Sequence, residues 1–146
     1  MRWWNGLCVL AMLAPSAAAE PLRPYVVEGD AITRSLTGRP GDAENGRRLV
    51  MDRHRSLCVL CHAAPLPDPH LHGTLAPTLA GAGSRLNEGQ IRLRIADMKR
   101  LVPDSIMPAY YRTDGLARVA ASFRDRPILT AEEIEDVVAF LVTLKE

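Results

Sequence analysis

Aromatic side chains are scarce in this sequence, which has two tryptophans, three tyrosines and two phenylalanines among 146 residues. Trp3 and Trp4 lie at the N-terminus, so only five aromatics remain for the rest of the chain. A small domain with so few large side chains needs another source of buried apolar surface or a covalent cross-link. The length fits one such domain, since single domains span about 100–200 residues.

An excess of charge of either sign is also absent. Lysine and arginine total 18 and the acidic residues total 17, which gives a formal net charge of +1. Proteins that bind nucleic acids usually carry a basic excess, so this balance gives no support to a nucleic-acid partner. Lysine itself is nearly missing, because Lys99 and Lys145 are its only occurrences.

No apolar run reaches the roughly 20 residues that a membrane-spanning helix needs. The N-terminus has a shorter pattern, with Arg2, an apolar stretch over residues 7–13, and small residues that end at Ala19. This pattern predicts a secretory signal peptide over residues 1–19 and a periplasmic protein without a membrane span after cleavage, and a retained membrane anchor is the alternative. Cleavage removes Arg2 and no acid, which leaves 17 basic and 17 acidic side chains.

Cysteine is scarce as well, with only three in the sequence. Cleavage of the signal peptide would remove Cys8 and leave Cys58 and Cys61. In an oxidising compartment cysteines are normally paired or otherwise consumed. The close spacing of these two allows a redox disulfide, half of a metal site, or the attachment of a cofactor.

The segment Cys58-Val59-Leu60-Cys61-His62 has the C-x-x-C-H pattern of covalent c-type haem attachment. On a helical turn this spacing puts both sulfurs on one edge, where each can form a thioether to a haem vinyl group, while His62 binds the iron. A thioredoxin-like site is disfavoured because it needs a βαβ context that the sequence lacks. A zinc site is disfavoured by its spacing. It would add two histidines from the set His54, His62, His70 and His72.

A second axial ligand must come from elsewhere in the chain, and a His/Met pair is a common arrangement that raises the reduction potential. We predict Met107, because it precedes Pro108 in an irregular loop that can aim a side chain across the porphyrin. The alternatives are His70 and His72, which follow the motif closely, and Met98, for which a core position is expected.

Pro77 is the candidate for a supporting contact to His62. Its backbone carbonyl can accept a hydrogen bond from the ring nitrogen of His62 that does not bind iron. Such a contact sets the tautomer of the imidazole and tunes the iron.

Helical periodicity and capping signals predict an all-α fold. Asp42 is the expected N-cap of a first helix, and Thr130 with Glu133 forms a capping box for the last. Either Ser84 or Asn87 can cap a middle helix that runs to about residue 98. On that helix the basic residues are expected to face outwards, namely Arg92, Arg94 and Lys99.

Proline and glycine mark the segments between these helices. Residues 20–40 have no helical period and are expected to form an extended N-terminal arm. Residues 64–83 and 101–129 are expected to be long loops, the second with a short helical turn near residues 116–122.

Taken together, these features resemble a class I cytochrome c domain over residues 41–146. Within that class the chain resembles the SoxX subunits of the SoxAX cytochromes of sulfur oxidation. The resemblance is carried by Gly73-Thr74 with Pro77-Thr78-Leu79-Ala80-Gly81-Ala82-Gly83, by Ile106-Met107-Pro108-Ala109-Tyr110, and by residues 127–141.

The resemblance implies helices around one covalently attached haem c, and a periplasmic heterodimer with a SoxA-like cytochrome subunit. It also implies oxidative coupling of thiosulfate to a cysteine of a SoxYZ-like carrier, an L-cysteine S-thiosulfotransferase reaction that passes electrons to a downstream acceptor. In that family the catalytic haem belongs to SoxA, so this chain would relay electrons. The sequence agrees, since Cys58 and Cys61 leave no thiol once they are in thioethers, and we assign no catalytic residue.

The alternative is a free-standing periplasmic cytochrome c that shuttles electrons. Such a shuttle commonly carries lysines around its exposed haem edge, which steer it to acidic partners. The near absence of lysine argues against a shuttle, and the N-terminal arm suits a subunit that wraps a partner.

Overall fold

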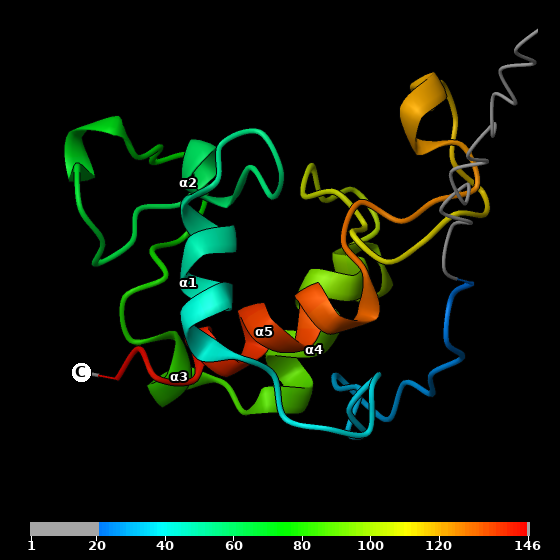
Figure 1. Cartoon of the computed structure of the whole chain (residues 1–146), viewed down its shortest axis with the longest axis horizontal. Coiled ribbons are helices and arrows are strands. Elements are labelled where there is room, and N and C mark those ends of the chain that lie inside the picture. The colour runs from blue at the N-terminus through cyan, green and yellow to red at the C-terminus, as the bar shows by residue number, and fades with distance from the viewer. Residues whose placement is uncertain (1–20, 146) are drawn as a thin grey trace, which may run out of the picture.

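Helices supply nearly all the regular structure in the computed structural model, which describes residues 21–145 (Figure 1). The predicted signal peptide, residues 1–19, lies outside the described residues. Strand pairing in the described part is limited to two isolated bridges, Glu28 with Ala31 and His62 with Ala76. In chain order the helices, with 3-10 helices marked η, are α1 (Ala43–Met51), α2 (Cys58–Cys61), η1 (Pro69–Leu71), α3 (Ala82–Arg85), α4 (Glu88–Asp97), η2 (Met98–Arg100), η3 (Ala121–Phe123) and α5 (Ala131–Leu141).

Helix α1 packs across α5, so the two ends of the domain meet (Figure 1). The predicted N-cap Asp42 is confirmed, because its carboxylate accepts hydrogen bonds from the N–H groups of Glu44 and Asn45. Gly46 lies at the crossing, where an added Cβ would stand 1.9 Å from the carbonyl oxygen of Asp136. The missing side chain therefore lets the backbones approach closely.

Helices α4 and α5 both begin with capping boxes. At the start of α5, Thr130 Oγ1 accepts from the N–H of Glu133 at 3.2 Å, and the Glu133 carboxylate accepts from the N–H of Thr130 at 2.8 Å. This predicted box is confirmed, and Asn87 rather than Ser84 caps α4, with Gln90 as its partner. The apolar side of α5 is buried and consists of Ala131, Ile134, Val137, Val138, Phe140 and Leu141.

Arg92 does not face outwards, and that prediction is wrong. Its side chain is only 3% exposed, and its Nε and Nη2 donate to the Glu135 carboxylate of α5 at 2.7 and 2.9 Å. The Nη1 donates to the carbonyl of Ile32 at 2.8 Å. The periodicity of one helix could not reveal this position, because the carboxylate that compensates the charge lies 43 residues away.

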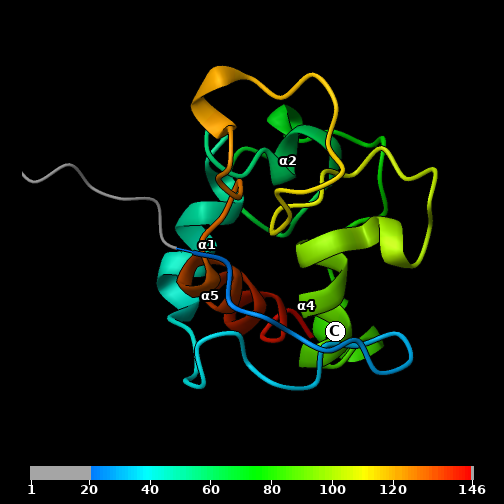
Figure 2. The ribbon, with the colours of Figure 1, turned by 90° about the vertical axis from the view of Figure 1, so that its right-hand side faces the viewer.

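The N-terminal arm, residues 21–40, contains no helix and runs alongside α4 and α5 (Figure 2). Ile32 is 1% exposed, and its N–H donates to the carbonyl of Gly89 at 3.0 Å. The N–H of Leu36 donates to the Glu135 carboxylate at 2.8 Å. Nearer its start, Arg23 forms an ion pair with Glu132 at 3.0 Å. The arm is therefore fastened to the same helices that form the core.

The two long loops are present and contain only short helical pieces. Residues 64–83 include η1 and the start of α3, and η3 overlaps the end of the segment near residues 116–122 where a helical turn is expected. No helix within residues 21–145 is both long and apolar enough to cross a membrane.

Candidate functional site

Helix α2 is a single turn that carries both cysteines of the C-x-x-C-H motif. Residues three apart on a helix share a face, so the Cys58 and Cys61 side chains leave α2 on the same side. Both are free thiols on partly exposed residues. Burial of its sulfur raises the pKa of the Cys58 thiol, which is therefore protonated at neutral pH.

A tight turn joins α1 to α2 and sets the position of the first cysteine. The Asp52 carboxylate accepts from the N–H groups of His54 and Arg55 at 2.8 and 2.9 Å, and these hydrogen bonds lower the pKa of Asp52. Its carbonyl accepts from the N–H groups of Ser56 and Leu57 at 3.2 and 3.1 Å. Leu57 has a left-handed backbone with φ of 63°, a conformation that costs roughly 1–2 kcal/mol for a residue with a Cβ. The turn is thus held firmly enough to keep one strained residue beside Cys58.

His62 follows α2 directly and its ring is held in one orientation. Its Nδ1 lies 2.6 Å from the carbonyl oxygen of Pro77, which accepts only if Nδ1 carries the proton. The backbones of the two segments are also paired, because the N–H of Ala76 donates to the carbonyl of Cys61 at 2.9 Å. With the proton on Nδ1, the lone pair of Nε2 is available to a metal.

The loop after the motif folds back tightly onto α2. The N–H of Gly73 donates to the carbonyl of Val59 at 2.8 Å. A Cβ at Gly73 would stand 2.0 Å from the carbonyl oxygen of Leu60, so only glycine fits here without a shift of the backbone. The loop therefore packs directly on α2, and this packing brings the Pro77 carbonyl to the His62 ring.

Met107 lies in the second long loop and packs partly buried against the apolar core. Its N–H donates to the Ser105 hydroxyl at 3.2 Å. Just beyond it, the N–H groups of Tyr110 and Tyr111 donate to the carbonyls of Ile95 and Ala96 on α4, at 3.3 and 3.0 Å. The loop is thus anchored to α4 within a few residues of Met107.

Tyr110 connects this loop to the motif, a link that the sequence reasoning missed. Its ring is buried, and its hydroxyl donates to the carbonyl of Ser56 at 2.5 Å, two residues before Cys58. Burial, reinforced by the neighbouring Cys58 and Cys61, raises the pKa of Tyr110 well above its usual value. A tyrosine in a loop carries no local sequence signal for such a contact.

The alternative ligands His70, His72 and Met98 lie outside the buried core. His70 is exposed, and His72 is partly buried with an unpartnered Nδ1. Met98 begins η2 and is absent from the buried residues and from the side chains packed against the core. A zinc site would need several cysteines and histidines together, and the part of the chain from 21 to 145 contains no such group of three.

The donor set and its surroundings fit a covalently attached haem. Two free thiols lie on one face of a turn, and an adjacent imidazole has its Nε2 available. Large apolar side chains beside these residues are open to solvent, with Leu60, between the cysteines, 40% exposed and Ile106, next to Met107, 76% exposed.

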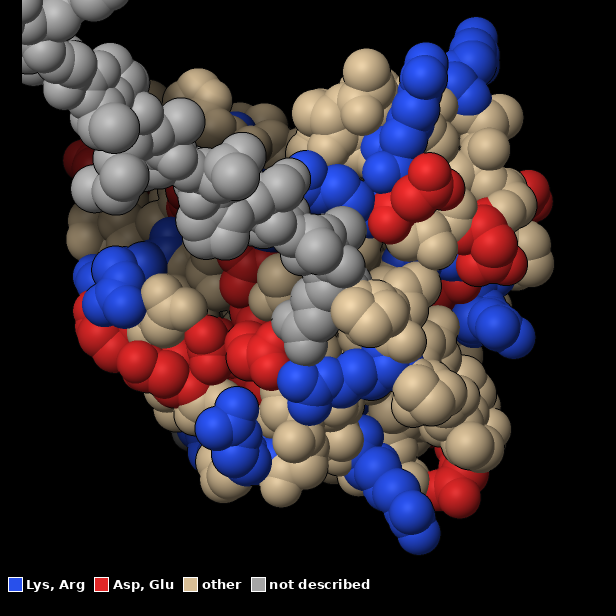
Figure 3. All heavy atoms as spheres, turned by 45° about the vertical axis from the view of Figure 1, so that its right-hand side comes forward, with Lys and Arg blue, Asp and Glu red and all other residues tan. Residues whose placement is uncertain are grey.

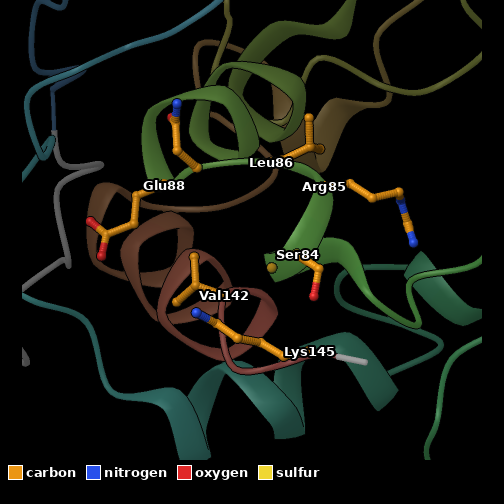
Figure 4. Close-up of a pocket in the computed structure, with 8 residues that line it drawn as sticks. Ser84, Arg85, Leu86, Glu88, Val142 and Lys145 are labelled. Atoms are coloured by element: carbon orange, nitrogen blue, oxygen red, sulfur yellow. The ribbon is translucent and has the colours of Figure 1, made fainter.

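A hollow near the C-terminus is separate from this site (Figure 4). It lies between α3, the start of α4 and the end of the chain, and none of the predicted site residues lines it. Arg85 extends away from it, and its guanidinium donates to the carbonyls of Ala80 and Thr78 at 2.6 and 2.9 Å. The hollow is lined by Gly83, Ser84, Arg85, Leu86, Asn87, Glu88, Val142 and Lys145.

Comparison with known proteins identifies the family. No protein-family model matches the sequence, and no curated protein sequence matches it. Among solved structures, the crystal structure of SoxXA from P. pantotrophus contains a chain that is 42% identical and superposes with a TM-score of 0.79. The match covers 88% of this chain and 100% of that one. The chain belongs to the SoxX family.

Membership of the SoxX family confirms the predicted fold class and the resemblance drawn from the sequence. The fold is all-α and of the class I cytochrome c type, and the protein is a cytochrome subunit of the SoxAX type.

Proposed function

We propose that this SoxX-family protein is a periplasmic electron-relay subunit that holds one covalent haem c and pairs with a SoxA-like cytochrome. The observation that carries the proposal is the motif on α2, with two thiols on one face and the His62 ring held by the Pro77 carbonyl at 2.6 Å. Membership of a family that contains SoxXA supports the heterodimer. Export follows from the signal peptide predicted over residues 1–19.

Five residues would hold the haem. Cys58 and Cys61 would form the thioethers, and His62 and Met107 would bind the iron. Pro77 keeps the His62 imidazole in the tautomer that presents Nε2. A haem bound in this way supplies a one-electron couple between ferric and ferrous iron.

Among residues 21–145, the sulfur chemistry of thiosulfate finds no free thiol once the haem is attached. With Cys58 and Cys61 in thioethers, the part of the chain that the structure describes has no free thiol for a covalent sulfur intermediate. The coupling of thiosulfate to a cysteine of a SoxYZ-like carrier therefore takes place on the partner subunit. The SoxX-family protein itself accepts the electrons that this coupling releases and passes them to a downstream acceptor.

The shuttle alternative is not favoured. The similarity to a chain of a SoxXA complex points to a subunit rather than a free carrier. On the face shown in Figure 3, basic and acidic side chains are interleaved, and lysine, which commonly steers a shuttle to acidic partners, occurs only twice in the sequence.

Covalent attachment of the haem is the first test. The protein would be expressed with a signal peptide in a host that matures cytochromes c, and then extracted with acidified acetone. We expect the colour to stay with the protein, because thioether bonds survive this treatment. Colour that moves into the organic phase would contradict the attachment to Cys58 and Cys61, and a Cys58→Ala, Cys61→Ala variant serves as the control.

The partner is the second test. The tagged protein would be purified under mild conditions from the periplasm of its native host. We expect a second c-type cytochrome subunit to co-purify in equal amount, and thiosulfate-dependent reduction of the haem to require it. Recovery of the tagged chain as a monomer that accepts electrons without a partner would support the shuttle instead.

A further inference from the structure

Tyr110 joins two parts of the chain that are far apart in sequence. Its hydroxyl donates to the carbonyl of Ser56 at 2.5 Å, across a separation of 54 residues. Ser56 is completely buried and lies two residues before Cys58. Tyr110 lies three residues after Met107. The hydrogen bond therefore spans from the attachment motif to the loop that carries the proposed second axial ligand.

Both ends of this hydrogen bond are held by other contacts. The Ser56 hydroxyl donates to the carbonyl of Leu49 at 2.5 Å, and its N–H donates to the carbonyl of Asp52 at 3.2 Å. Tyr110 donates through its N–H to Ile95, at 3.3 Å, and its carbonyl accepts from the N–H of Leu129 at 3.1 Å. Each end therefore belongs to an ordered segment, and the phenol links the two segments at a defined separation.

We infer that Tyr110 is a positioning residue, whose hydroxyl holds the Met107 loop at the distance from the Cys58-x-x-Cys61-His62 segment that allows Met107 to bind the iron. The inference rests on the proposed function, since it assumes that Met107 is the ligand. Tyr110 itself does not bind the iron. Without the Tyr110 hydroxyl, the Met107 loop moves away from the iron more readily, and an external ligand can then bind the iron in place of Met107.

The neighbouring Tyr111 provides a matched control. Both tyrosine rings are 3% exposed, and both hydroxyls are hydrogen-bonded. The Tyr111 hydroxyl accepts from the N–H of Arg23 in the arm at 2.8 Å, and its ring contacts that of Tyr25, so it does not reach the motif. Replacing Tyr111 with phenylalanine removes the same atom from the same loop and leaves the link to Ser56 intact.

The test measures how tightly imidazole binds to the ferric holoprotein and how strong its red iron–methionine absorption band is. We expect Tyr110→Phe to bind imidazole about tenfold more tightly than the unmodified protein, with a weaker red band, because a lost buried hydrogen bond is worth about a factor of ten. Tyr111→Phe is expected to stay within about twofold. Met107→Ala should lose the band entirely.

Each outcome decides a separate point. Equal imidazole affinity for Tyr110→Phe and Tyr111→Phe, with a normal loss of the band in Met107→Ala, would overturn the role of Tyr110 alone. An unchanged band in Met107→Ala would overturn both this role and the ligand assignment. If Tyr110→Phe does not accumulate with haem, a ring-fluorinated tyrosine at this position replaces it. As a stronger donor it should weaken imidazole binding, and an unchanged affinity would contradict the inference.

Discussion

Arg92 and Glu135 form an ion pair almost completely shielded from water, with side chains 3% and 4% exposed. Two charges in such a place are tolerated only because nearly every donor and acceptor is satisfied. The Arg92 guanidinium bonds two carboxylate oxygens and the Ile32 carbonyl, and the Glu135 carboxylate also accepts from the N–H of Leu36. This one pair holds α4, α5 and the N-terminal arm together.

Removing one partner of this pair should be more harmful than removing both. We expect Glu135→Leu to lower the free energy of unfolding by about 3–5 kcal/mol, because it leaves the Arg92 charge buried with only the distant, exposed Glu88 carboxylate, at 3.8 Å, as an ionic partner. The double variant Arg92→Met, Glu135→Leu should recover part of that loss. Denaturant unfolding of the holoprotein measures both, with Arg94→Met as the control, since the partly exposed Arg94–Asp30 pair contributes at most about 1 kcal/mol. If the double variant lost the sum of the free energies lost by the two single variants, the coupling between Arg92 and Glu135 would be contradicted.

Because the Tyr110 hydroxyl is buried, we expect the free energy of unfolding to depend on pH at the alkaline end of the range. Burial raises the pKa of Tyr110 above its usual value, so in the window above about pH 10 the unfolded chain loses a proton that the folded chain keeps. The folded state then binds more protons, and its stability is full below about pH 10 and falls as the pH rises further. We expect the unfolding free energy to decline less steeply in Tyr110→Phe, with a residual slope from Tyr25, whose pKa burial also raises.

At the scale of elements, local sequence predicted α1, α4 and α5 and the caps of α1 and α5, but not η1 or α3. Asp42 and the Thr130–Glu133 box act within one turn of their own helices, so their roles can be read from the adjacent residues. The C-x-x-C-H motif is local in the same sense. Arg92 and Tyr110 have partners 43 and 54 residues away, and such contacts depend on how the helices pack. The part of the site that could not be predicted is therefore the part that joins separate elements.

The crossing of α1 and α5 depends on the absence of a side chain at Gly46. We expect Gly46→Ala to destabilise the holoprotein by about 1–3 kcal/mol, since its Cβ would stand 1.9 Å from the Asp136 carbonyl oxygen and force the helices apart. Alanine favours a helix by about 1 kcal/mol over glycine, so a stabilised variant would show that the crossing relaxes freely. Thermal unfolding measures this, with Arg48→Ala on the exposed side of α1 as the control.

At the scale of the whole molecule, the proposed haem accounts for the scarcity of aromatic residues. Only Tyr110, Tyr111 and Phe140 are buried among the aromatics of residues 21–145. A covalently held porphyrin would add a large apolar plate to such a core, and its two propionates would make the chain, which is formally neutral after the proposed cleavage, mildly acidic.

The apoprotein is therefore expected to fold poorly. We expect a Cys58→Ala, Cys61→Ala variant, produced without haem, to lose most of its helical circular dichroism and to unfold without a cooperative transition. The holoprotein is the reference in the same buffer. Native helix content with a sharp thermal transition in the variant would show that the polypeptide alone supplies enough buried surface.

The fastening of the arm has a consequence for the order of folding. Its contacts reach residues 88, 99 and 109 positions further along the chain, to Tyr111, Glu135 and Glu132. Contacts over such separations are slow to form, because a long loop must close before they repay its entropy. In the export that we propose, the arm leaves the channel first, and its contacts with the last helix cannot form until that helix has followed. During that interval the α2 turn, whose backbone–backbone hydrogen bonds lie within residues 52–79, can form early and would be accessible for the proposed attachment of the haem.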